Sequence, residues 1–122
     1  MSATWLVAED GHRLVRLSRI ADIEVVPDGD PNDLARIHPS RRLTMSRRAT
    51  IMVSTGEGWV RVLTCPGQDA RQAWIELSKL VAEPPGSQFG SYVHAATWSR
   101  GEKPRVIWKV AAKVPEPEWA AA

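Results

Sequence analysis

The residues of this 122-residue sequence that could act as nucleophiles or transition-metal ligands are few and far apart. Cys65 is the only cysteine, and the three histidines, His12, His38 and His94, lie far from it and from one another. No C-x-x-C, H-x-x-x-H or H-E-x-x-H spacing places two metal ligands side by side. The G-x-S-x-G, Walker, G-x-G-x-x-G and S-x-x-K motifs of common enzyme classes are also absent from the sequence. We therefore expect no catalytic residue, no cofactor and no metal; spacing alone leaves open a Cys65–His pair formed by the fold.

An acidic segment at residues 28–33 comes closest to a metal-binding motif. The run Asp28-Gly29-Asp30-Pro31-Asn32-Asp33 places side-chain oxygens at alternate positions, as a calcium loop does. An EF-hand loop, however, requires glycine at its sixth position and glutamate at its twelfth, where this sequence has Asp33 and Pro39. Aspartate, asparagine, glycine and proline all favour turns. We therefore predict a turn that ends a strand and binds no calcium.

Positive charge is concentrated in two segments, although the net charge of the chain is only +2. Residues 34–56 contain no acid and several arginines, namely Arg36, Arg41, Arg42, Arg47 and Arg48. Residues 91–114 contain a single acid and a second basic set, namely Arg100, Lys103, Arg105, Lys109 and Lys113. Arginine binds phosphate through two parallel hydrogen bonds, and tryptophan stacks on bases. These two segments, together with Trp59, Trp98 or Trp108, therefore form a candidate nucleic-acid interface.

The alternative explanation is that the arginines solvate a loop and a sheet face while the tryptophans fill the core. Trp119 lies outside any periodic pattern and is a further candidate for contact with a partner.

Alternation of apolar and polar residues predicts strands with one buried face. Turn residues divide these strands into a hairpin at 5–17, a strand at 21–25, a hairpin at 49–64 and a hairpin at 92–112. No period persists from residue 27 to about residue 46, and we expect a loop there. Its length exceeds what structureless loops in compact domains usually reach, so it is functional, disordered or contains an unrecognised element.

A helical period follows Pro66-Gly67 and ends at Glu83-Pro84-Pro85-Gly86. One face is apolar and consists of Ala70, Ala73, Trp74, Leu77, Leu80 and Val81. We predict an α+β fold in which about seven strands, mainly antiparallel and arranged in hairpins, form a sheet closed by one amphipathic helix near 68–83. Trp5, Trp74 and Trp108 are expected in the core. Residues 1–114 are predicted to be a single domain, and residues 115–122 an extended, proline-containing tail.

Residues 12–83 consist of predicted strands followed by a closing helix that carries Trp74, and in this order they resemble the small bacterial pleckstrin-homology-like domains. The resemblance implies that the helix plugs the end of a bent sheet. It also implies a binding platform and not an enzyme. The present sequence departs from that pattern because another hairpin follows the helix.

Composition is that of an ordinary globular protein, with 43% hydrophobic and 25% charged residues. The preference for arginine, alanine, valine and proline is consistent with a GC-rich bacterial genome. One cysteine allows no internal disulfide, and neither a signal peptide nor a membrane-spanning apolar run is recognised, so we expect a cytoplasmic protein. We interpret it as a non-enzymatic binding or scaffolding module whose partner is a protein or a second copy of itself. The alternative is a nucleic-acid-binding protein that uses the two basic segments.

Overall fold

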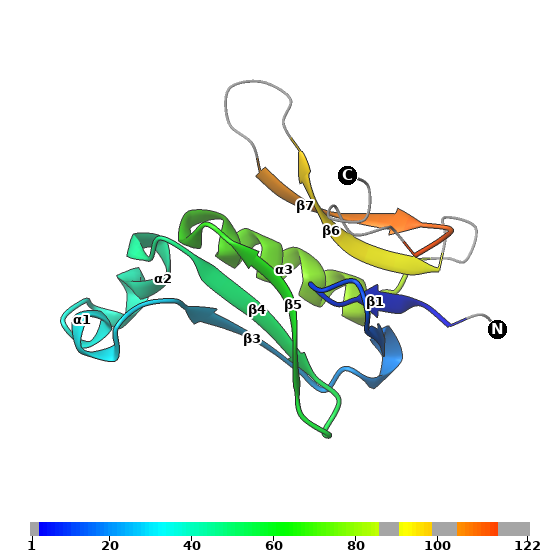
Figure 1. Cartoon of the computed structure of the whole chain (residues 1–122), viewed down its shortest axis with the longest axis horizontal. Coiled ribbons are helices and arrows are strands. Elements are labelled where there is room, and N and C mark those ends of the chain that lie inside the picture. The colour runs from blue at the N-terminus through cyan, green and yellow to red at the C-terminus, as the bar shows by residue number, and fades with distance from the viewer. Residues whose placement is uncertain (1–2, 86–90, 99–104, 115–122) are drawn as a thin grey trace.

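Two β-sheets and a helix between them make up the structure, a computed structural model that describes residues 3–85, 91–98 and 105–114 (Figure 1). The strands are β1 (Trp5–Val7), β2 (Leu14–Arg16), β3 (Asp22–Pro27), β4 (Ala49–Ser54), β5 (Trp59–Cys65), β6 (Tyr92–Trp98) and β7 (Arg105–Ala111). The helices are η1 (Leu17–Arg19), α1 (Pro31–Ala35), η2 (Pro39–Arg41), α2 (Arg42–Met45) and α3 (Gly67–Ala82). The predicted α+β class, the predicted hairpins and the amphipathic helix are confirmed.

The strands form two sheets, whereas the sequence was interpreted as one. A four-stranded sheet has the order β2-β1-β6-β7, and a three-stranded sheet has the order β3-β4-β5. Among the described strands, β1 and β6 pair in parallel and all other neighbours are antiparallel. This parallel pair joins the first hairpin to the last one across most of the chain, so no local pattern reveals it.

The three-stranded sheet follows the predicted alternation. Ile23 and Val25 of β3 lie opposite Val53 and Ile51 of β4, and these four side chains face the core. The turn between β4 and β5 contains Gly56 and Gly58 at φ values of 97° and 135°, which residues with a Cβ rarely adopt. The hairpin register is therefore set by its turn as well as by its apolar face.

Helix α3 lies between the two sheets and contacts both (Figure 1). Its residues Ala70, Ala73 and Leu77 are buried. Trp74 packs against the core, and its indole Nε1 donates to the carbonyl oxygen of Ile23 in β3 at 3.1 Å. From the other sheet, the indole Nε1 of Trp108 donates to the carbonyl oxygen of Ala73 at 2.9 Å. The core placement of Trp74 and Trp108 is thus confirmed, with both side chains half-buried.

The predicted core position of Trp5 is wrong. Leu6 next to it is fully buried in the core, and successive residues of a strand point to opposite faces of the sheet. Trp5 therefore lies on the outer face of the four-stranded sheet and is half-buried there.

The segment expected to be a loop contains the short helices α1, η2 and α2. Asp30 begins α1, because its carboxylate Oδ1 accepts a hydrogen bond from the backbone N–H of Asn32 at 2.8 Å and proline occupies the first helical position. His38 caps η2 in the same way through its ring Nδ1 and the N–H of Ser40. Helices of three to five residues are too short to show a helical period, which is why the sequence did not reveal them.

Candidate binding surface on the four-stranded sheet

The outer face of the four-stranded sheet carries aromatic side chains on its two central strands. We define the outer face by Trp5, Arg16, Tyr92, His94, Ala96, Arg105, Ile107 and Lys109, which alternate along their strands with residues of the core. The opposite, inner face contains Leu6, Val93, Ala95, Trp108 and Val110 and packs over α3. Trp5, Tyr92 and His94 remain half-buried without belonging to the core cluster.

Strand register places the outer-face residues in rows across the sheet. In one row, Trp5 of β1 lies between Arg16 of β2 and Tyr92 of β6. In the next row, two residues further along β6, His94 pairs with Lys109 of β7. Aromatic side chains therefore occupy the central strands and basic side chains the edge strands. Arg16, Arg105 and Lys109 are all exposed.

The electrostatic character of this surface follows from its composition. As the structure describes them, β1, β2, β6 and β7 contain no aspartate or glutamate. The corresponding outer face of the three-stranded sheet carries the exposed carboxylates of Asp22 and Glu24 beside the exposed guanidinium of Arg61. The outer faces of the two sheets thus differ in charge, and that of the four-stranded sheet is the positive one.

The two basic segments found in the sequence lie in different layers of the fold. The first lies around α1 and α2, at one end of the lower layer in Figure 1, where α2 packs on α3. In it Arg36, Arg41, Arg47 and Arg48 are exposed, whereas the Nε of Arg42 donates to the carbonyl oxygen of Ile37 at 3.1 Å. Arg42 is therefore tied to the fold and is a weak candidate for contact with a partner.

The second basic segment belongs to the upper layer, where Arg105 and Lys109 project from β7 and Lys113 follows it. All three side chains are exposed. Arg100, Lys103 and Trp119, the remaining predicted contact residues, lie outside the described residues, as does the predicted tail at 115–122.

The tryptophans considered for base stacking lie in different parts of the fold. Trp108 faces the core, Trp59 is 45% exposed on the three-stranded sheet, and the side chain of Trp98 lies outside the described part of the chain. Four further residues of this surface could not be recognised from the sequence pattern, namely Trp5, Tyr92, His94 and Arg16. The alternation in the last hairpin already placed Tyr92 and His94 on one face, but their position beside Trp5 depends on the β1–β6 pairing.

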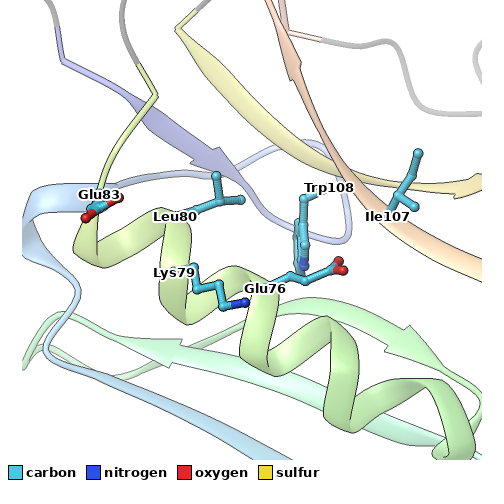
Figure 2. Close-up of a pocket in the computed structure, with 6 residues that line it drawn as sticks. All are labelled: Glu76, Lys79, Leu80, Glu83, Ile107 and Trp108. Carbon is cyan, nitrogen blue, oxygen red and sulfur yellow. The ribbon is translucent and has the colours of Figure 1, made fainter.

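A groove of about 350 Å³ lies between α3 and β7 (Figure 2). Leu80 and Trp108 supply its apolar walls, β7 borders it at Ile107, and Glu76, Lys79 and Glu83 of α3 supply its charged rim. The indole of Trp108 points toward the helix in Figure 2. No cysteine, serine or histidine is among the described residues that line it.

Cys65 lies at the end of β5 with 1% of its surface exposed. Burial, with a smaller contribution from the carboxylate of Asp69, raises the pKa of its thiol to about 11, although Arg48 acts in the opposite direction. The thiolate is the reactive form of cysteine. At neutral pH this residue is therefore a buried, protonated thiol, and it is not a nucleophile.

Labelling with Ellman's reagent, which reacts with accessible thiolates, should test whether the thiol of Cys65 is buried and protonated. At pH 7.5 we expect the native protein to react far more slowly than the same protein unfolded in guanidinium chloride, because the native thiol is both buried and protonated. Between about pH 8.5, the ordinary cysteine pKa, and about pH 11, the unfolded chain loses a proton that the folded chain keeps. The free energy of unfolding should consequently fall as the pH rises through this window. Rapid stoichiometric labelling of the native protein at pH 7.5 would contradict the assignment.

Three further searches, for metal ligands, for membrane-spanning helices and for similar proteins, assign no function to this chain. Within the residues described, no group of three or more histidine, cysteine, aspartate or glutamate side chains could hold a metal ion. No helix among the described residues is long and apolar enough to span a bilayer. No protein-family model, curated protein or solved structure matches this chain.

Proposed function

We propose that this protein is a non-enzymatic binding module whose contact surface is the outer face of the four-stranded sheet and whose partner is a polyanion. The observation that carries the proposal is the composition of that face. Three exposed cations, Arg16, Arg105 and Lys109, lie on strands that contain no carboxylate. A binding platform is also what the resemblance to pleckstrin-homology-like domains implies.

Electrostatics supports a polyanionic partner for a simple reason. Cations on strands that carry no carboxylate are not neutralised by an acidic residue of their own sheet, and several such cations act together on a chain of phosphates or sulfates. The attraction between exposed charges decays over about 8 Å at physiological salt. Binding should therefore weaken steeply as salt is added.

A second candidate function is self-association or contact with a protein. The outer face also contains apolar side chains, Ala96 and Ile107, and Leu14 at its border is 40% exposed. Its positive charge complements the carboxylates of Asp22 and Glu24 on the other sheet. Analytical ultracentrifugation at low and high salt tests this candidate, because such a contact would produce oligomers that dissociate when salt is added.

The main test is salt-titrated binding of fluorescently labelled inorganic polyphosphate. Each cation that neutralises a phosphate contributes about 0.7–0.9 to the slope of log affinity against log salt concentration. Replacing Arg105 and Lys109 together by alanine should therefore flatten the slope by about 1.4–1.8. Stability should change little, because exposed charges contribute little to folding.

The matched control replaces Arg36 and Arg41, two exposed arginines of the α1–α2 region. We expect this pair to leave the slope nearly unchanged. If the control flattens the slope and the β7 pair does not, the Arg-rich segment is the contact surface and the proposal is wrong. Absence of any polyphosphate binding at 20 mM salt would also reject it.

A further inference from the structure

We infer that the polyanion is single-stranded nucleic acid, with bases stacked on the aromatic side chains of β1 and β6 and phosphates held by the basic side chains of β2 and β7. The inference rests on the proposed function, because it assigns an occupant to the same face. It is carried by a separate observation, the presence of aromatic rings between the cations. A polyanion without bases would make no stacking contact with these rings.

The aromatic side chains are adjacent. Trp5 and Tyr92 are register partners on neighbouring strands, whose backbones lie about 4.8 Å apart. The backbone N–H of Trp5 also donates to the carbonyl oxygen of Ser91 at 2.8 Å, which ties β1 to the start of β6. His94 follows two residues along β6, about 6.6 Å further in an extended strand. Three rings thus lie on one face of the sheet, close enough for consecutive bases of one strand.

These rings are not required by the core. The indoles of Trp74 and Trp108 are each fixed by a hydrogen bond to a backbone carbonyl, and both pack against the buried cluster. No such bond holds the indole of Trp5 within the described part of the chain. Trp5 and Tyr92 stand outside the core cluster and are each half-buried. Aromatic rings that are not fully buried on a sheet are surfaces on which bases can stack.

The cations border the rings at both edges of the sheet, on the same face. Arg16 is the register partner of Trp5 on one edge strand, and Lys109 is the partner of His94 on the other. Arg105 lies four residues before Lys109 on β7 and so shares its face. A strand whose bases rest on the middle of the sheet would place its phosphates near these edges. Arginine can bind a phosphate through two parallel hydrogen bonds.

This arrangement favours a single strand over a duplex. Bases in a duplex are stacked on one another, so their faces are not available to protein side chains, whereas the bases of a single strand can be splayed onto aromatic rings. Ala96 and Ala111 contribute small side chains to the same face, which leaves room beside the rings. Every base has a face that can stack on an aromatic ring, so we expect the protein to bind single strands of different base sequence with similar affinity.

The test is fluorescence anisotropy with labelled 12-nucleotide dT and rU strands, a duplex of equal length and labelled polyphosphate. Trp5→Ala and Tyr92→Ala should each weaken single-strand binding by about 5- to 150-fold. Both should leave polyphosphate binding nearly unchanged, because no cation is removed. Trp59→Ala is the matched control, since it removes a tryptophan that is 45% exposed on the other sheet; it should change neither affinity.

A second measurement covers the case in which alanine at position 5 destabilises the fold. Trp5→Phe and Tyr92→Phe retain an aromatic ring and should retain most of the single-strand affinity. Oligonucleotide added to the unaltered protein should quench part of its tryptophan fluorescence. The Trp5→Phe protein should bind but lose this quenching, and the Trp59→Phe protein should keep it.

The outcomes separate this inference from the proposed function. Equal binding of polyphosphate, duplex and single strand, unaffected by the aromatic variants, would overturn the inference while leaving polyanion binding in place. Quenching that survives in Trp5→Phe and disappears in Trp59→Phe would move the stacking to the other sheet and overturn it as well. If no polyanion of any kind binds at 20 mM salt, both proposals are wrong.

Discussion

Replacing Trp74 by alanine should lower the free energy of unfolding by about 3–5 kcal/mol, the usual cost of removing a large aromatic side chain from a packed site. Trp74 packs against the core between α3 and the three-stranded sheet. Its indole Nε1 also donates to the part-buried carbonyl oxygen of Ile23, and loss of this hydrogen bond adds to the cost. Domains of this size have a total stability of about 5–15 kcal/mol, so the loss is a large fraction of it.

Urea denaturation monitored by circular dichroism measures this loss. Trp59→Ala is the control: the residue is of the same type but 45% exposed at the end of the neighbouring hairpin, and its removal should cost far less. Trp74→Phe keeps most of the apolar surface and removes the hydrogen bond, so its effect should lie between the two. A loss below about 1 kcal/mol for Trp74→Ala would show that α3 does not depend on this contact.

Ending the chain after Pro85 should abolish cooperative folding. This truncation removes β6 and β7, so that β1 keeps only β2 as a neighbour, and an isolated two-stranded hairpin is marginally stable in water. It also uncovers Leu6, which is fully buried, and the side of α3 that receives the indole of Trp108. Exposed apolar surface of this kind promotes association.

Thermal melting, dye binding and light scattering together measure this effect. A chain that ends at Val114 is the control, because it keeps every described strand. We expect the chain ending at Pro85 to bind a hydrophobic dye and to form oligomers, with no sharp melting transition. If it is monomeric and as stable as the full chain, the last hairpin is an appendage and the two-sheet core is misassigned.

The parts of the fold that could be predicted are those determined by neighbouring residues. The β4–β5 hairpin was recognisable because its alternation and its glycine turn lie within one short stretch, and α3 because its apolar face repeats over several turns. The helices α1 and α2 were not recognised because they are only five and four residues long, too short for a helical period to appear. The start of α1 is set instead by the local cap at Asp30.

The candidate site was only half predictable, for the same physical reason. Charge can be counted along a sequence, so Arg105 and Lys109 were identified as candidates. Trp5 and Tyr92 are adjacent only because β1 and β6 become neighbours. This pairing is decided by packing around α3 and not by either strand alone. Trp5 was therefore assigned to the core on its apolar character, and the fold instead places it on the surface.

The parallel pairing of β1 with β6 also has a consequence for how the chain folds during synthesis. The ribosome releases β1 early, yet its second neighbour follows only after both the three-stranded sheet and α3 have been made. Contacts between such distant segments form slowly, because a long stretch of chain must be closed before any contact is gained. Until then the nascent chain presents an unpaired strand edge and an uncovered apolar helix face, both of which favour aggregation. We therefore expect the four-stranded sheet, and with it the candidate binding surface, to assemble last during folding.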